Sequence, residues 1–468
     1  MENEKSIGQK LQDELLINRK NGGIIFSDEE LKKVDAYCEG YKKFLDDGKT
    51  EREVVINALE AAKKHGFVEF ELNKKYAAGD KVYYNNRGKA LILAIYGTEP
   101  IEKGVNIMAS HIDSPRIDLK CRPLYEEAEI AYFKTHYYGG IKKYQWTAMP
   151  LSLHGVVIKA DGTPVTICIG EDETDPVFCI TDLLPHLAQD QMKRTVAEAI
   201  KGEELNVVVG SRPFKDDAAS EKVKLNIMKA IFEKYDIVES DFLSAELELV
   251  PAFKAKDIGF DRSLVGAYGQ DDRVCAYTSF TATLEAKDVK RTLVTILADK
   301  EEVGSDGNTG LNSSYLKYFI ADLAKPFGIE GRTVLSHSKC LSADVNAAFD
   351  PTFPEVTEKK NVAYVNYGVV VTKYTGARGK SGTSDASAEF VGEVNRMLTK
   401  EGVLWQHGEL GKVDQGGGGT VAAYVANLNV DVIDIGVPVL SMHAPFEMTS
   451  KIDVYSTYKA FTAFAKHV

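Results

Sequence analysis

The sequence predicts an α/β fold in which a layered α/β domain is interrupted by a mostly β insert. In the first and last parts of the chain, short apolar runs typical of buried strands alternate with segments of helical periodicity. Between about residues 121 and 248, short alternating segments are instead broken by glycine, proline and aspartate, which indicates β structure. We therefore expect a discontinuous main domain, 1–120 with 249–468, and an inserted β-rich domain, 121–248.

Two helices, a hairpin and a strand are predicted before the insert. Ser27 opens a helix because Glu30, three residues on, completes a capping box and apolar residues follow at helical spacing. A second helix, over 51–65, is expected to stop at Gly66, since glycine is favoured just past a helix end. The remaining predictions are a hairpin of 82–84 with 90–96 and a buried strand over 104–109.

The same criteria predict the later elements. In the insert, strands are expected at 155–159 and 165–169 and a helix at 220–235. After the insert, the predicted helices are 273–285, 313–325, 384–400, 420–427 and 454–467. The predicted strands are 293–297, 334–336, 362–372 and 432–435.

Composition excludes several classes of function. The net charge of -12 argues against a nucleic-acid partner, which needs a basic face. No apolar run approaches the roughly 20 residues that cross a bilayer, and the charged N-terminus lacks the apolar stretch of a signal peptide. The six cysteines are scattered without a CxxC pair, which indicates reduced thiols in a cytoplasmic protein. Any metal must therefore be held by His, Asp and Glu side chains.

The segment 292–304, TLVTILADKEEVG, is the centre of the predicted site. It is an apolar strand that runs directly into two adjacent carboxylates, Glu301 and Glu302. Catalytic groups of covered sheets lie at the carboxyl ends of strands, and two neighbouring acids there need a cation or a shared proton to offset their repulsion. For an isolated pair of glutamates, a solvated acidic turn would be the simpler interpretation.

Other residues suited to divalent metal binding follow apolar strands or begin helices, and each has a simpler structural explanation when considered singly. A lone histidine after a strand is more often hydrogen-bonded, an aspartate pair at a helix N-terminus favours the helix dipole, and the aspartate of SADV could cap a turn before a helix. Together they form a set of side chains that suits zinc or manganese. These residues are His111 and Asp113 in SHIDSP, Asp271 and Asp272 in GQDDR, Asp344 in SADV, and His443 in SMHAPFE.

The order HxD, DD, EE, SAD and MH resembles that of the zinc exopeptidases with two cocatalytic metals. SHIDSPR, PHLA at 185–188, SADV before Asn346 and SMHAPFE resemble the M18 aminopeptidases in particular, the aspartyl-aminopeptidase-like group. The resemblance covers essentially the whole chain, including the insert. It implies a three-layer α/β/α catalytic domain with an inserted dimerisation domain.

The resemblance also implies the roles of the site residues. His111 and Asp344 would complete one metal site, Glu302 and His443 the other, and Asp271 would bridge both ions. Glu301 would be the general base, and Asp113 would orient the imidazole of His111. These roles agree with chemistry, because a ligating histidine commonly gives its second ring N–H to a carboxylate and a carboxylate not spent on metal can move a proton. Zinc would be the first choice of ion, with manganese or cobalt as alternatives.

Two further features of the insert and of the C-terminal part follow from the resemblance. His186 of PHLA resembles a histidine that reaches the active site of a neighbouring subunit; the alternative is a buried structural histidine between Leu184 and Leu187. The glycine segment 416–419 resembles one beside the active site, where it could bind a substrate carboxylate or form only a tight turn. The implied assembly is a homo-oligomer, a dodecamer built from dimers.

We predict from these observations an aminopeptidase with two zinc ions that removes the N-terminal residue of peptides, with no nucleic-acid or membrane partner. The chain has Asp271-Asp272-Arg273 where acidic-specific members have Asp-Asn, so a preference for N-terminal Asp or Glu stays open. A carboxypeptidase or amide deacylase of the same clan and a non-catalytic binding protein on this fold are the alternatives. The insert with PHLA argues against the first, and the spare carboxylate of Glu301 against the second.

Overall fold

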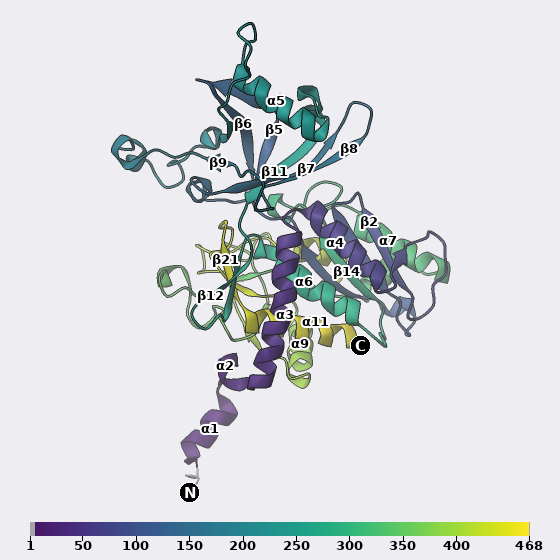
Figure 1. The fold of residues 1–468 in the computed structure, drawn as a ribbon. Helices are drawn as coiled ribbons and strands as arrows, with labels where there is room; N and C mark the ends of the chain where they lie inside the picture. The colour runs from purple at the N-terminus through teal and green to yellow at the C-terminus, as the bar shows by residue number, and fades with distance from the viewer. Residues whose placement is uncertain (1–4, 468) are drawn as a thin grey trace.

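The computed structural model describes residues 5–467 and consists of two bodies (Figure 1). The lower body contains a nine-stranded and a five-stranded sheet, and the upper body contains a seven-stranded sheet. Helix α1 (Ile7–Leu15) and the short α2 (Gly22–Ile25) precede the lower body, and α1 projects away from it with no buried residue.

The nine-stranded sheet is the centre of the lower body. Its middle strands are parallel to one another, which places their carboxyl ends at one edge. In spatial order the strands are β1 (Val68–Glu69), β2 (Lys81–Asn86), β3 (Ala90–Ile95), β14 (Leu293–Ala298), β4 (Asn106–His111), β15 (Lys339–Ala343), β19 (Asp431–Gly436), β17 (Val369–Thr372) and β18 (Trp405–His407).

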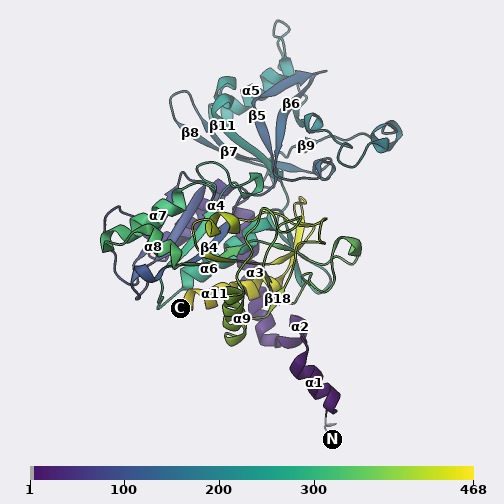
Figure 2. The ribbon, with the colours of Figure 1, turned by 180° about the vertical axis from the view of Figure 1, so that it is seen from behind.

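Both faces of this sheet are covered by helices, so its central strands β3 and β14 are buried along their whole length. Leu91 and Leu93 of β3 face one hydrophobic core, while Ile92 and Ala94 face the other, as the two-residue period of a strand requires. The first core includes α3 (Asp28–Asp47), α4 (Glu51–Lys64), α6 (Gln270–Glu285), α9 (Ala388–Lys400) and α11 (Lys451–Lys466). The second includes α7 (Tyr315–Ala324), α8 (Gly331–Ser336) and α10 (Ala422–Ala426), and Figure 2 shows this side. The predicted three-layer α/β/α architecture is confirmed.

The upper body is built on an antiparallel sheet. Its order is β8 (Pro164–Ile169), β7 (Leu151–Ile158), β11 (Ala245–Pro251), β5 (Arg116–Glu127), β6 (Ile130–Tyr138), β10 (Val207–Gly210) and β9 (Cys179–Ile180). Helix α5 (Lys222–Tyr235) packs against one face through Val223, and Trp146 is fully buried in the same core.

The five-stranded sheet lies beside the main sheet and carries the start of α6. Its order is β12 (Lys256–Ile258), β13 (Leu264–Ala267), β21 (Glu447–Ser450), β20 (Pro438–Leu440) and β16 (Asn346–Ala347). Because β13 pairs antiparallel with β21, with Ala267 opposite Glu447, the segments after β13 and before β21 meet at one end of this sheet.

Most predicted elements are present, and two predictions of strands need correction. Ser27 caps α3 and forms the capping box with Glu30. The segment 334–336 is not a strand but the end of α8, and the strand follows it at β15. A three-residue apolar run cannot distinguish a strand from a buried helical turn, which explains the error. Of the strand predicted over 362–372, only Val369–Thr372 pairs with the sheet.

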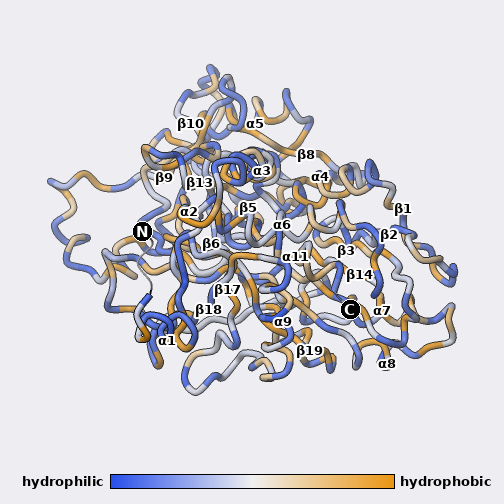
Figure 3. Tube along the Cα trace, turned by 90° about the horizontal axis from the view of Figure 1, so that it is seen from below, coloured by the Kyte–Doolittle hydropathy of each residue, from blue (hydrophilic) through white to orange (hydrophobic). Residues whose placement is uncertain are grey.

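Hydrophobic segments are short and interrupted by hydrophilic ones along the chain (Figure 3). Among the described residues, 5–467, no helix combines the length and the apolar character needed to span a membrane. All six cysteines are unpaired, as predicted.

Candidate metal centre

Three of the acidic and histidine residues come from neighbouring strands of the main sheet. His111 is the last residue of β4, and Asp344 directly follows β15. Glu301 begins a short 3-10 turn, Glu301–Val303, soon after β14 ends. Strand β4 lies between β14 and β15 and is parallel to both, so the three strand ends deliver these side chains to one place.

The five-stranded sheet supplies the other two residues. Asp271 lies at the start of α6, four residues after the end of β13, and His443 lies in the turn between β20 and β21. His443 adopts a positive φ of 64°, a conformation that a non-glycine residue enters only when its surroundings hold it there. The pairing of β13 with β21 therefore brings two segments more than 150 residues apart in sequence to the edge of the main sheet.

Asp271 lies between the two histidines. Its Oδ1 is 3.3 Å from Nε2 of His111, and its Oδ2 is 3.2 Å from Nε2 of His443. On the outer sides, Oδ1 of Asp344 lies 3.9 Å from Nε2 of His111, and Oε2 of Glu302 lies 3.5 Å from Nε2 of His443. The arrangement is a symmetrical one, with a shared carboxylate in the middle and a histidine with a second carboxylate on each side.

These side chains fit a pair of divalent ions. Two ligands bound at 2.0–2.2 Å to one tetrahedral ion lie roughly 3.4 Å apart, which matches the separations around Asp271. Atom Oε1 of Glu302 is buried without a hydrogen-bond partner among the described residues, so it has coordination capacity to spare. All of the donors are imidazole nitrogen and carboxylate oxygen, which zinc, manganese and cobalt accept. One ion position would lie between His111 and Asp344, and the other between His443 and Glu302.

Asp113 is fully buried beside His111 and links it to the glutamates. Its Oδ1 lies 3.4 Å from Nδ1 of His111, the ring nitrogen away from Asp271. The backbone N–H groups of Glu301 and Glu302 donate to its carboxylate at 3.1 and 3.2 Å, and the hydroxyl of Tyr138 donates at 2.8 Å. Asp113 therefore fixes both the imidazole and the turn that carries Glu301.

Glu447 is a site residue that the sequence analysis did not single out, although it lies in the quoted SMHAPFE motif. It is buried, and its Oε1 accepts the backbone N–H of His443 at 2.8 Å. Its Oε2 accepts the N–H groups of Gln270 and Asp271 at 2.6 and 3.1 Å. One side chain thus holds the backbone of Asp271 and that of His443 together.

Burial and neighbouring charges shift the pKa values of the site. Burial raises the pKa of Glu301 to about 7, with the carboxylates of Asp113 and Asp271 adding to the rise and the histidines opposing it. Burial alone would lower the pKa of His111, but hydrogen bonds with Asp113 and Asp271 raise it well above its usual value. The Glu301 carboxyl can consequently exchange a proton near neutral pH.

A cavity of about 900 Å³ opens over these residues. Its wall includes Glu301, Asp344 and His443, together with the glycine segment 417–419 and Tyr424. The volume lies within the range of small-molecule sites, and the acidic cluster forms one part of the wall. A peptide end could therefore reach the cluster from solvent.

The sequence matches the profile of the family described as "Aminopeptidase I zinc metalloprotease (M18)" over residues 44–465. The chain belongs to the M18 family of zinc aminopeptidases. It is a metallo-aminopeptidase, a hydrolase of peptide bonds, as its relatives are named. A probable M18 family aminopeptidase 1 of Clostridium acetobutylicum is 52% identical, covering 97% of this chain and 99% of its own.

Solved structures agree with this family membership. An M18-family aminopeptidase of Thermotoga maritima superposes with a TM-score of 0.93 at 43% identity, covering 97% of this chain and 100% of its own. Aminopeptidase I of C. acetobutylicum gives a TM-score of 0.91 at 51% identity, covering 96% and 99%. A yeast mApe1 dodecamer, at 21% identity, shares the fold with a TM-score of 0.75 over 93% of this chain and 97% of its own.

His186 of this M18 aminopeptidase lies away from the acidic cluster in its own chain. It occupies the middle of a short 3-10 turn, Pro185–Leu187, in the long segment after β9, and it does not line the cavity. The alternative of a buried structural histidine is wrong, because His186 is exposed to solvent. Leu184 and Leu187 beside it are also exposed, by 51% and 70%.

A second histidine of the aminopeptidase, His154, is buried between two carboxylates where the insert meets α4. Its Nδ1 lies 2.7 Å from Oε1 of Glu53, and its Nε2 lies 3.1 Å from Oε1 of Glu171. Lys49 also pairs with Glu171 at 2.7 Å. The sequence analysis did not identify this group, because its members are far apart in the chain and none of them belongs to a recognisable motif.

Proposed function

We propose that this M18 aminopeptidase holds two divalent ions, zinc in the first place with manganese or cobalt as acceptable replacements. His111 and Asp344 would complete one site, and Glu302 and His443 the other. Asp271 would be shared between the ions, and this bridge is the observation that carries the proposal: its two oxygens face different histidines, at 3.3 and 3.2 Å. A shared anion is what two nearby cations need to offset their repulsion.

Glu301 is the proposed general base and acid. When bound, divalent ions acidify water and polarise a carbonyl group. Glu301 lies 3.9 Å from His111 and is not needed to complete either proposed ion site, so its carboxylate is free to accept a proton from water and pass it to the leaving amine. Its pKa, raised by burial to about 7, suits transfer in both directions at neutral pH.

Asp113 and Glu447 are proposed positioning residues. Asp113 would hold the ring of His111 so that Nε2 faces the first ion, since its carboxylate lies on the Nδ1 side. Glu447 would hold the backbone of Asp271 and His443, through the three N–H groups described above. Neither residue would touch the substrate.

The proposed substrates are peptides with a free N-terminus. The cavity bears carboxylates around the ion positions, which would attract the ammonium group of a peptide. The glycine segment 417–419 also lines the cavity and offers backbone groups to a bound peptide. A preference for N-terminal Asp or Glu is not supported by the described lining residues of the cavity, which include no lysine or arginine.

We also propose that the insert is a dimerisation domain and that the dimers build a dodecamer, which is the assembly described for the yeast mApe1 structure. The segment after β9 exposes five large apolar side chains, an arrangement that favours a protein contact. These are Leu183, Leu184, Leu187, Met192 and Val196. His186 lies among them, and we propose that it enters the active site of the adjacent subunit and stabilises the developing oxyanion. The unpaired thiols support a reducing, cytoplasmic location.

A reporter panel separates the proposed function from its rivals. The enzyme is stripped of metal by a chelator, each divalent ion is restored in turn, and aminoacyl and N-acyl reporters are assayed side by side. We expect zinc, manganese or cobalt to restore cleavage of aminoacyl reporters only. Cleavage of N-acyl reporters would favour a deacylase or carboxypeptidase of the same clan, and no cleavage at all would favour a binding protein.

A further inference from the structure

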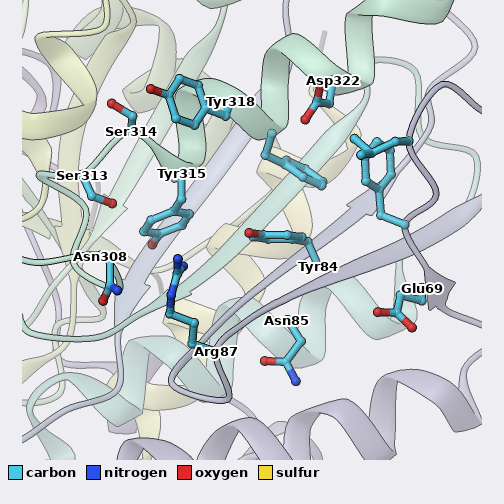
Figure 4. Close-up of a pocket in the computed structure, with 13 residues that line it drawn as sticks. Glu69, Tyr84, Asn85, Arg87, Asn308, Ser313, Ser314, Tyr315, Tyr318 and Asp322 are labelled. Atoms are coloured by element: carbon cyan, nitrogen blue, oxygen red, sulfur yellow. The ribbon is translucent and has the colours of Figure 1, made fainter.

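A second pocket lies on the α7 side of the main sheet, apart from the catalytic cavity. Its volume is about 570 Å³, and none of its lining residues belongs to the proposed metal centre (Figure 4). Strand β2 contributes Tyr84, the turn after β2 contributes Arg87, and α7 contributes Tyr315, Tyr318 and Asp322. The volume is in the range of pockets that hold small molecules.

One end of this pocket is suited to an anion. Arg87 and Tyr315 point toward each other in Figure 4, and no carboxylate among the described residues lies within 4.0 Å of the Arg87 guanidinium. Tyr315 is only 7% exposed, yet its hydroxyl has no hydrogen-bond partner in the described part of the chain. Burial raises the pKa of Tyr315, so this hydroxyl keeps its proton and can donate it in a hydrogen bond.

The first turn of α7 adds further donors at the same end. The helix has ten residues, and the side chain of its N-cap, Ser314, does not cap it. The N–H groups of the first turn have no partner within the helix, and they carry the positive end of its dipole. The hydroxyl of Ser313, which also lines the pocket, is likewise without a partner among the described residues.

The far end of the pocket has the opposite charge. Asp322 on α7 and Glu69 on the strand opposite both line the part of the pocket away from Arg87, on different sides of it (Figure 4), and neither is within 4.0 Å of a cationic group of the described residues. Asp322 lies seven residues after Tyr315 on the same face of α7, which corresponds to about 10 Å along the helix axis. Between the two ends, the rings of Tyr84, Phe70 and Phe319 form an apolar wall.

We propose that this pocket is a second, non-catalytic binding site for peptides of two or three residues with both termini free. Such a peptide spans about 7–10 Å when extended, which matches the separation of the two ends. Its carboxylate would bind Arg87, the Tyr315 hydroxyl and the start of α7, and its ammonium would bind Asp322. Its side chains would lie on the aromatic wall.

Calorimetric titration of the metal-loaded enzyme tests this site without any need for turnover. The probe is leucyl-N-methylleucine, whose substituted peptide bond resists hydrolysis, together with its C-terminal amide and its N-acetyl form. We expect the free dipeptide to bind in the pocket in addition to any binding at the catalytic site. We call the part of the isotherm that comes from this pocket the pocket component. The amide keeps the free amine but lacks the carboxylate, so its isotherm should lack the pocket component. The acetylated form lacks the ammonium group and should bind the pocket at least about tenfold more weakly.

Three variants locate the binding. Arg87→Gln is expected to weaken the pocket component about ten- to a hundredfold, because it removes a charge-assisted contact. Tyr315→Phe deletes a single oxygen and should weaken dipeptide binding to the pocket several-fold. Asp322→Asn removes a negative charge and should weaken the same binding by about tenfold. Arg332→Gln is the control, since Arg332 is 83% exposed on α8 and pairs with Glu330.

The proposal is overturned if the free dipeptide and its amide give the same isotherm, or if Arg87→Gln and Tyr315→Phe both leave the pocket component unchanged. If the acetylated dipeptide bound the pocket as tightly as the free dipeptide, the acidic end would not recognise the ammonium group, and that half of the proposal would be wrong. Because these readouts are binding isotherms, they stay informative even if the proposed catalytic roles are wrong.

Discussion

Glu447 and Asp271 lie 176 residues apart in the chain, yet the backbone N–H of Asp271 donates to Oε2 of Glu447 at 3.1 Å. The other oxygen of Glu447 accepts the N–H of His443 at 2.8 Å. A single buried carboxylate therefore sets the relative position of the proposed bridging ligand and of a histidine on the next segment. In the proposed metal centre, this contact would hold two of the ligands at the spacing that metal binding needs.

Replacing Glu447 should weaken metal binding without removing a ligand. In Glu447→Gln, one of the two oxygens becomes an NH₂ group that faces a backbone N–H, so one side of the contact is lost. We expect a loss of affinity of about 10- to 100-fold, measured by competition with a fluorescent chelator. Glu355→Gln, at an exposed position, is the control and should bind as the wild type does.

Glu301 and Glu302 are adjacent, and the proposal gives them different roles. Glu301→Gln should bind metal normally and lose about 100- to 10,000-fold in kcat, because it can no longer move a proton. Glu302→Gln should lose metal from one site. Metal content by mass spectrometry and kcat on an aminoacyl reporter separate the two, and a fully active Glu301→Gln enzyme would refute the assigned mechanism.

The proposed action of His186 across a subunit interface can be tested by complementation. His186→Ala and Glu301→Gln should each be nearly inactive alone. In co-expressed mixed dimers, the site with an intact Glu301 receives an intact His186 from its partner, so random pairing should restore about a quarter of the sites. If His186 instead acts within its own chain or has no catalytic role, the mixture will show no more activity than its two components.

His154 should make stability depend on pH. Burial opposes its charge, but hydrogen bonds with Cys168, Glu171 and Glu53 raise its pKa well above the usual value. Because the pKa of His154 is higher in the folded state than in the unfolded state, protonation of His154 adds to the free energy of unfolding. This contribution is complete below about pH 6.5, the unfolded pKa, and is lost as pH rises toward the pKa of the folded state.

The variant His154→Gln leaves the partly buried Glu53 without its cationic partner and removes one of the partners of Glu171, which should cost about 1–3 kcal/mol near pH 6. Urea unfolding at pH 6 and at pH 9 measures the effect, and the cost should be smaller at pH 9. The neighbouring charges Lys49 and Lys254 pair with Glu171 and are retained in both proteins. A cost that is equal at both pH values would show that His154 is neutral in the fold.

The sequence by itself predicted the layered architecture, most helices and strands and the set of chemistry-bearing residues. Local patterns are sufficient for these features: the apolar run of β14 indicates a strand covered on both faces, and Ser27 with Glu30 indicates the start of α3. The short motifs around His111, Asp344 and His443 then indicated metal chemistry and the family.

Tertiary structure alone decided how those residues meet. The 3.3 and 3.2 Å approaches of Asp271 to two histidines depend on the pairing of β13 with β21, which no local pattern encodes. Glu447, the contact between His154 and Glu53, and the pocket between Arg87 and Tyr315 were missed for the same reason. Each of these features joins groups that are remote along the chain. Packing and hydrogen bonding depend on how close two groups lie in space, and local sequence patterns do not give that distance.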